Sequence, residues 1–327
     1  MRTISLEELL EAGCHFGHQV TRQNPKARDY IFEARDGIHI IDLEKTKNGL
    51  EDAARFIKDI AKKGGTLMVL GTKRQAEGLM REEIKRITDA NPDGIHFVTK
   101  RWIGGTLTNF PEVSKNYKRL KDLSARLEDD YEKSKYTKKE IGEWEKERQK
   151  LLGFYGGASN MAKVPDALFI IDTHLERVAS HEAMRMGIPT VGITDTNADP
   201  TIIDYPIPAN DDAVGSLKLI ISYILDAWTE GKEQYKKGAA EDAVKAQKAK
   251  AAEEAAKLKA SDSASSPASA KVGTEPEVKA PAPKLFNVAE TKKAPEKKTA
   301  EKKPVEKKAT EKKPKEKKAP TKKANSK

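Results

Sequence analysis

The sequence has a single cysteine and no long apolar segment. Cys14 alone cannot form an internal disulfide, which fits a reducing compartment. No apolar stretch approaches the roughly 18 residues of a membrane-spanning helix. Residues 1–10 carry glutamates where a signal peptide needs an apolar core. These absences lead us to expect a cytoplasmic protein without a membrane segment.

The phosphate-binding and nucleophile motifs of common enzymes are missing as well. The chain contains no G-x-G-x-x-G, no G-x-x-x-x-G-K-[ST] and no G-x-S-x-G, and Cys14 has no recognisable general base beside it. The segment G-T-K-R at residues 71–74 could present N–H groups and two cations to a phosphate. That phosphate could belong to RNA as well as to a mononucleotide. We therefore expect neither catalysis nor a bound cofactor.

Two groups of potential metal ligands have simpler explanations. Cys14, His15 and His18 cluster after the first predicted helix, but a structural zinc site normally needs a fourth ligand and no second cluster supplies one. We expect the two histidines to pack or hydrogen-bond in a turn. Aspartates gather near predicted strand ends, at positions 195, 199, 204, 211 and 212. Mg²⁺ could bind there, although caps and turns explain most of them, so the sequence predicts no metal site.

Apolar strands and amphipathic helices alternate along most of the chain. The pattern predicts strands at residues 66–70, 95–98, 167–171 and 190–193, with a weak one around Ile202 and Ile203. Helices are predicted between them and from Val214 onward, and an Asp36-Gly37 turn predicts a hairpin over residues 31–41. Such alternation with continuously apolar strands indicates an α/β fold, namely a Rossmann-like or flavodoxin-like parallel sheet flanked by helices.

A helical insertion interrupts this alternation, and the composition changes after it ends. Residues 111–155 carry two amphipathic stripes separated by a capping box at Thr137 and Glu140, which predicts a coiled-coil hairpin. The α/β domain is then discontinuous and comprises residues 1–110 and 156–235. Residues 236–260, rich in Ala, Lys and Glu, are a candidate for a marginal helix. Residues 261–327 are expected to be a disordered, Lys-rich tail with a five-residue Lys-Lys repeat.

The excess positive charge is concentrated in that tail. Residues 290–327 hold 16 Lys and 6 Glu, so they account for the whole formal net charge of +10. A solubilising segment and a nonspecific tether to RNA both explain such a run. By contrast, residues 160–235 carry 5 basic and 12 acidic residues. This asymmetry suggests one face toward nucleic acid and one turned away from it.

The segment K-R-W-I-G-G-T-L-T-N at residues 100–109 combines several groups that suit nucleic acid. It follows a predicted strand, so it should lie at the carboxyl end of the sheet. Cations suit phosphates, an indole offers a stacking face, and paired glycines let backbone N–H groups approach an anion. The alternative is a tight loop with a buried tryptophan and two solvated cations.

Several segments together resemble the bacterial small-subunit ribosomal protein S2 family. E-L-L-E-A-G-C-H-F-G-H at residues 8–18 is similar to its amino-terminal signature, and residues 165–172 and 187–200 are similar to its second one. The resemblance implies a five-stranded parallel sheet with a projecting coiled-coil hairpin. It also implies a structural constituent of the small subunit that binds 16S-type rRNA between head and body and touches neighbouring small-subunit proteins. It further implies support for docking of the mRNA-binding ribosomal protein S1.

The RNA-facing positions of that family match a set of residues in this chain. They are Arg22, Lys26, Arg28, Lys73, Arg74, Lys100, Arg101 and Trp102. We expect Thr106 and Asn109 of the same loop to contact rRNA as well. We expect the cations to contact phosphate and sugar. Solvated charges are the alternative for the three residues of the N-terminal arm. For Trp102, packing beneath the glycine loop competes with stacking on RNA.

The tail can be tested by deletion. Because residues 261–327 show no core-forming pattern, a chain that ends at residue 260 should still enter the small subunit. Comparing the truncated and full-length chains in subunit fractions of a sucrose gradient measures this. Failure of the truncated chain to assemble would contradict the prediction.

Overall fold

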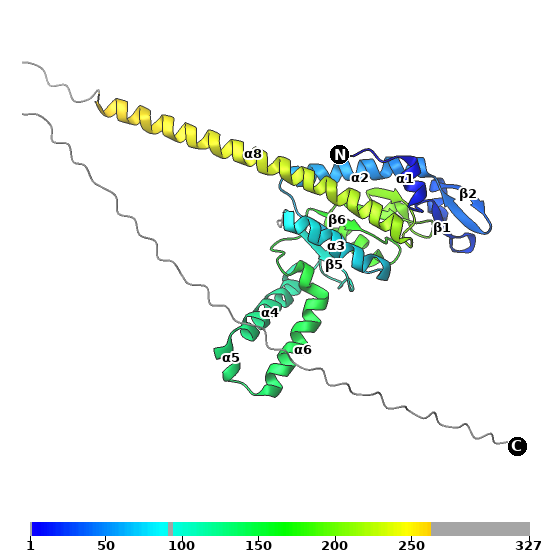
Figure 1. Ribbon diagram of the computed structural model, residues 1–327, viewed down its shortest axis with the longest axis horizontal. Helices are drawn as coiled ribbons and strands as arrows, with labels where there is room; N and C mark the ends of the chain where they lie inside the picture. Colours follow the sequence, from blue (N-terminus) through cyan, green and yellow to red (C-terminus); the bar gives the residue numbers. More distant parts are fainter. Residues whose placement is uncertain (1, 91–93, 263–327) are drawn as a thin grey trace, which may run out of the picture. The chain divides into compact units, whose positions relative to one another are not determined.

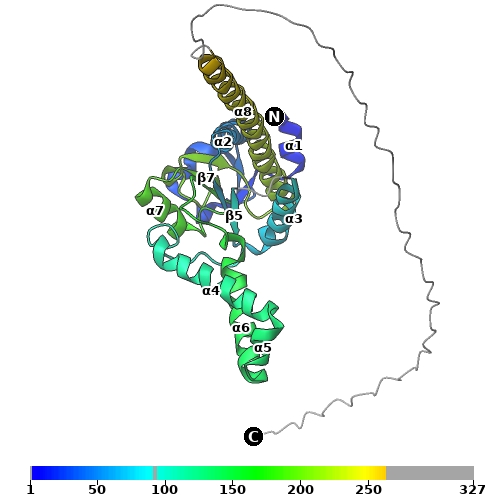
Figure 2. The ribbon, with the colours of Figure 1, turned by 90° about the vertical axis from the view of Figure 1, so that its left-hand side faces the viewer.

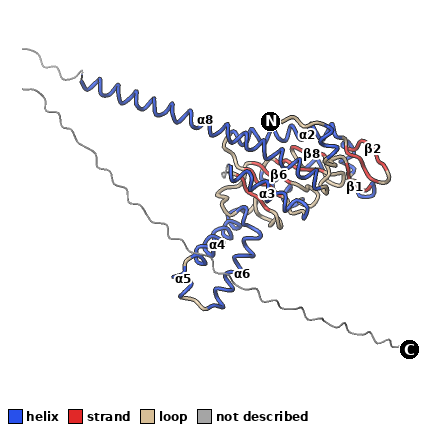
Figure 3. Tube along the Cα trace, in the orientation of Figure 1, coloured by secondary structure: helices blue, strands red, loops and turns tan. Residues whose placement is uncertain are grey.

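A five-stranded parallel sheet forms the centre of the fold (Figures 1 and 3). The structure is a computed structural model that describes residues 2–90 and 94–262. The strand order is β5-β4-β6-β7-β8. The bounds are β4 Leu67–Leu70, β5 Ile95–Val98, β6 Ala167–Ile170, β7 Thr190–Thr194 and β8 Tyr205–Pro208. Every residue of β4, β6 and β7 is buried, as expected when helices cover both faces of a parallel sheet. The predicted parallel sheet is confirmed.

The two faces of the sheet carry separate apolar cores. In β6, Phe169 packs into a core shared with helices α2, α3 and α8, whereas its neighbours Leu168 and Ile170 pack into a second core with α4 and α7. Alternate side chains of a strand point to opposite faces, which explains this division. The helices lie on the two sides of the sheet in Figure 2. Their bounds are α2 Leu43–Lys62, α3 Arg74–Ala90, α4 Phe110–Glu128, α7 Arg177–Met186 and α8 Val214–Asp262.

Helix α8 is the longest element of the fold. The sequence pattern places Val214, Leu217, Ile221, Leu225 and Trp228 on its buried side. The last four are buried, but Val214, at the first position of the helix, is 54% exposed. The helix then continues without interruption through residues 236–260. Within the described residues, no helix is long and apolar enough to cross a membrane. The predicted disordered tail lies outside the described residues from position 263 onward.

A small antiparallel sheet precedes the parallel one in the sequence. Its order is β1-β3-β2, with β1 Phe16–Gln19, β2 Ile31–Arg35 and β3 Ile38–Ile41, and helix α1 Leu6–Glu11 comes before it. Asp36 and Gly37 connect β2 to β3 with φ values of 51° and 78°. Two consecutive left-handed residues are typical of the tightest hairpin turns. The predicted hairpin is confirmed.

Helices fill the segment that interrupts the alternation. Helix α4 is followed by α5 Asp130–Ser134 and α6 Lys138–Tyr155, and α4 and α6 lie side by side. Arg119 of α4 forms a bidentate pair with Glu147 of α6, with distances of 3.0 and 2.9 Å. The predicted capping box of Thr137 and Glu140 starts α6. The coiled-coil character of this hairpin and the exact division of the chain into domains stay predictions.

Both edge strands of the parallel sheet are obstructed. Beside β5, Gly157 lies so close that a Cβ atom added to it would be 2.3 Å from the carbonyl oxygen of Phe97. On the opposite edge, β8 contains Pro206 and Pro208, which have no N–H group. The weak strand predicted around Ile202 and Ile203 is wrong. Residues 200–202 form a 3₁₀ turn, because the carboxylate of the preceding aspartate accepts from a backbone N–H two residues on.

The buried core predicts unequal effects for two phenylalanines. Phe169 is fully buried in the central strand β6, so Phe169→Ala should lower the free energy of unfolding by about 3–5 kcal/mol. Phe32 is 72% exposed, so Phe32→Ala should change it by less than about 0.5 kcal/mol. Urea unfolding followed by circular dichroism measures both values. Equal losses in the two variants would contradict this packing.

Candidate nucleic-acid interface

Four strands of the sheet end in a cluster of charged side chains. Lys73 follows β4, Asp172 follows β6, Asp195 follows β7, and Asp211 and Asp212 follow β8. The carboxyl ends of parallel strands share one edge, which brings these distant residues together. The ammonium group of Lys73 lies 2.8 Å from Asp211 Oδ1, 2.7 Å from Asp212 Oδ1 and 3.4 Å from Asp172 Oδ2. One lysine therefore pairs with three carboxylates.

Lys73 is held inside this cluster. Its side chain is 14% exposed and Asp211 is 2% exposed. Burial alone would lower the pKa of Lys73, but the attraction and hydrogen bonds of the carboxylates outweigh that effect and raise it. A phosphate entering here would meet the three aspartates. Of the two cations predicted to contact RNA at this turn, Arg74, which is exposed at the start of α3, is the better placed.

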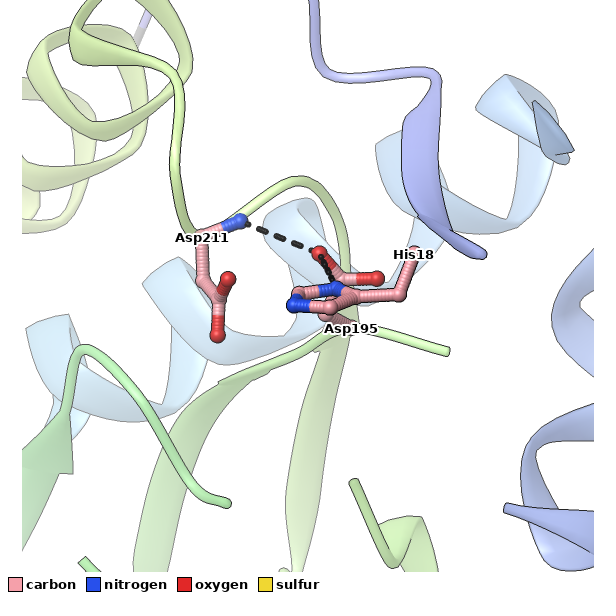
Figure 4. A group of neighbouring side chains, drawn as sticks. All are labelled: His18, Asp195 and Asp211. Carbon is pink, nitrogen blue, oxygen red and sulfur yellow. Dashed lines mark hydrogen bonds and ion pairs between the residues drawn. The ribbon is translucent and has the colours of Figure 1, made fainter. Parts of the chain in front are cut away.

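His18 belongs to the same cluster (Figure 4). Its Nδ1 lies 3.1 Å from Asp195 Oδ2, and its Nε2 lies 3.6 Å from Asp212 Oδ2. The hydrogen bond with Asp195 raises the pKa of His18 despite its partial burial. Burial, and repulsion from Asp172 and Asp195, raise the pKa of Asp211 to about 7. Four carboxylates thus surround two basic side chains, Lys73 and His18, in this cluster.

The three residues first considered as metal ligands are separated by the fold. Cys14 is buried, and burial raises the pKa of its thiol despite a hydrogen bond with Ser216. His15 contacts the ring of Phe16, with ring centroids 4.0 Å apart, and partial burial lowers its pKa. Of these three residues, only His18 lies close to other potential metal ligands in the part of the chain that the structure describes. Atoms of His18, Asp195 and Asp211 all lie within 4.8 Å of one another, and a histidine with two carboxylates is a donor set that a divalent cation accepts.

Carboxylates lie at the switch point of the sheet. Ligands of open α/β sheets bind where the strand order reverses, which here is between β4 and β6. The Thr72 hydroxyl donates a hydrogen bond to the buried Glu176, and Lys73 is engaged with aspartates. Carboxylates thus surround the groups that would otherwise face a phosphate.

The loop of residues 100–109 exposes its two cations and buries its indole. The side chain of Lys100 is 52% exposed and lies 3.2 Å from Glu77 Oε1, and Arg101 is exposed. Trp102 is 7% exposed, packs in the core beneath α4 and α7, and donates its indole N–H to Glu182 Oε1 at 3.2 Å. Of the two interpretations of Trp102, the structure shows packing, so its ring is not a stacking face.

Glu182 turns the backbone of this loop inward. Its carboxylate accepts from the backbone N–H groups of Gly105 at 2.7 Å, Leu107 at 3.0 Å and Thr108 at 3.3 Å. The sequence suggested that these N–H groups would face an RNA anion, but in the structure they face a protein carboxylate. Thr106 is buried and its hydroxyl bonds to the carbonyl of Ile103. These three N–H groups are therefore engaged within the protein, while the side chains of Lys100 and Arg101 are exposed.

The last residue of the loop and the N-terminal arm are at the surface. Asn109 is exposed and immediately precedes α4. Arg22 and Arg28 are exposed within two short 3₁₀ segments, Val20–Arg22 and Pro25–Tyr30. Between them, Lys26 is exposed, and its ammonium group lies 2.7 Å from Asp199 Oδ2 and 3.1 Å from Thr201 Oγ1. The arm therefore carries cations that solvent reaches.

A comparison with protein families gives a long match. The model of the family described as Ribosomal protein S2 matches residues 9–231. The match begins in α1 and ends in α8, so it covers both sheets and the helical insertion.

The contrast between Lys73 and Arg74 can be tested directly. Lys73→Ala leaves nearly buried carboxylates without their cation and should lower the free energy of unfolding by about 3–5 kcal/mol. Arg74→Ala removes the same charge from an exposed position and should change it by less than about 0.5 kcal/mol. Denaturant unfolding at neutral pH measures both. Equal stability of the two variants would show that Lys73 does not hold the cluster together.

Proposed function

Because the chain belongs to the ribosomal protein S2 family, and is thus a small-subunit ribosomal protein, we propose that it binds small-subunit rRNA through exposed cations of the N-terminal arm and of the loop of residues 100–109. The observation that carries this proposal is the loop itself. Lys100 and Arg101 reach solvent there, while Trp102 and the loop N–H groups are engaged inside the protein.

The surroundings of the two loop cations favour a phosphate ligand. Glu77 is the carboxylate nearest to Lys100, and its side chain is 29% exposed. Surface pairs of this kind contribute little to stability, so a phosphate can replace the carboxylate at small cost. Phosphate contacts then fix the orientation of the protein on the RNA without reading its sequence.

The exposed arginines of the arm and of α3 extend the proposed contact. Arg22, Arg28 and Arg74 have planar guanidinium groups that match phosphate geometry. Lys26 contributes from its exposed pair with Asp199. Asn109, at the end of the loop, is exposed and available to sugar or phosphate. Lys73 and Thr106 act from within the protein by holding the surrounding structure.

Family membership supports the protein partners of the proposal. We propose that the chain lies between the head and body of the subunit, touches neighbouring small-subunit proteins, and helps ribosomal protein S1 to dock. The protein then acts on the ribosome in the cytoplasm. Comparing the amount of S1 on subunits with and without this protein tests the last point, and equal amounts would contradict it.

A salt titration of rRNA binding tests the loop contact. The double variant Lys100→Ala with Arg101→Ala should bind small-subunit rRNA more weakly. The slope of log affinity against log salt should fall by up to about two, because up to two phosphate contacts are lost.

A matched pair of cations provides the control. Lys62 and Lys63 are also adjacent and exposed, but they end α2 at the amino-terminal side of β4. Lys62→Ala with Lys63→Ala should leave the slope unchanged. An unchanged slope in the loop variant, or an equal fall in both variants, would contradict a contact through Lys100 and Arg101. Sedimentation of the wild-type protein apart from small subunits would contradict the wider proposal.

A further inference from the structure

We propose that Glu182 is the positioning residue of the RNA contact: it fixes the loop so that Lys100 and Arg101 are held toward the RNA before binding. This inference rests on the proposed function. Glu182 itself touches no RNA in this scheme, because its side chain is buried, with an exposure of 7%.

Both oxygens of the Glu182 carboxylate are occupied by the loop. Oε1 accepts from the Trp102 indole N–H at 3.2 Å and from the Gly105 N–H at 2.7 Å. Oε2 accepts from the Leu107 N–H at 3.0 Å, and from the N–H and the hydroxyl of Thr108 at 3.3 Å each. One side chain of α7 therefore gathers five donors from residues 102–108.

Hydrogen bonds from the loop, rather than a basic side chain, stabilise the Glu182 carboxylate in the described part of the chain. Among the residues whose side chains the structure describes, 2–89 and 94–239, no lysine, arginine or histidine forms an ion pair with Glu182. A buried carboxylate is costly unless hydrogen bonds stabilise it, and bonds to an ionised acceptor are stronger than neutral ones. The negative charge is thus stabilised by the loop, and the loop conformation is stabilised by the charge. Gly105, with φ of 89°, permits the backbone turn that this arrangement requires.

The two cations lie between two anchored residues. On one side, the Thr99 hydroxyl accepts a hydrogen bond from Arg81 at 3.1 Å at the end of β5. On the other side, Trp102 is held by Glu182 and by the core. Only Lys100 and Arg101 separate these anchors, so their backbone has little freedom. Order that exists before binding does not have to be created on binding, which strengthens the complex.

A double-mutant cycle tests the role of Glu182. Glu182→Gln keeps the shape of the side chain but turns an amide NH₂ group toward N–H donors, so the loop should lose its fixed position. We expect rRNA affinity to fall roughly tenfold, because the displaced loop no longer holds Lys100 and Arg101 against phosphates and up to two of their contacts are lost. The salt slope should fall toward that of the Lys100→Ala, Arg101→Ala variant. Adding Glu182→Gln to that double variant should weaken binding by less than about twofold, because the cations it positions are already gone.

Two further variants separate positioning from general stability. Asp166 also caps backbone with its carboxylate, accepting from the Thr66 N–H at 2.7 Å, but at the amino-terminal side of the sheet. Asp166→Asn should therefore leave the salt slope unchanged even if the protein is less stable. Trp102→Phe removes a single donor to Glu182 while keeping an apolar ring in the core, and should give a smaller loss in the same direction. If Glu182→Gln does not fold, Trp102→Phe tests the same interaction in its place.

The possible outcomes distinguish the two proposals. Normal binding by Glu182→Gln, together with weak binding by the Lys100→Ala, Arg101→Ala variant, overturns the role of Glu182 alone. Losses that multiply in the triple variant, or a salt slope that stays at the wild-type value in a folded Glu182→Gln protein, also overturn it. Normal binding by the Lys100→Ala, Arg101→Ala variant instead overturns the loop contact.

Discussion

Negative charge buried at the carboxyl end of the sheet has to be compensated by the chain itself, and this constraint shapes the whole surface around it. The chain compensates this buried charge in two ways. The aspartates after β6, β7 and β8 are balanced in part by Lys73 and His18. Glu182 is balanced by N–H groups of a loop. Each of them withdraws a group that sequence patterns assigned to RNA. The exposed arginines, Lys26 and Lys100 remain as cations that reach solvent.

The fold was largely predictable because its signals are local. Continuously apolar runs marked the strands, an Asp-Gly pair marked the β2–β3 turn, and Thr137 with Glu140 marked the start of α6. The last strand was placed too early for an equally local reason. Pro206 and Pro208 made β8 hard to predict, since proline is unusual in strands. The two prolines are tolerated here because β8 is an edge strand.

The candidate site was less predictable because its contacts join distant parts of the sequence. Lys73 and Asp211 are 138 positions apart, and Trp102 and Glu182 are 80 apart. A list of cations cannot show which of them already have a carboxylate within reach. The glycine pair did signal N–H groups that approach an anion, but nothing in the local pattern revealed that the anion belongs to α7. The aspartates near the predicted strand ends did indicate that distant residues would meet, because the carboxyl ends of parallel strands share one edge of the sheet.

The obstructed edges of the parallel sheet have a consequence for the life of the chain before assembly. Before a ribosomal protein joins its subunit, an open sheet edge can recruit a strand from another copy. Gly157 closes one edge by pressing backbone against Phe97, and the prolines of β8 deprive the other of donors. The fold that places the loop of residues 100–109 at the end of β5 thus also limits edge-to-edge pairing between copies of the chain before they join the subunit.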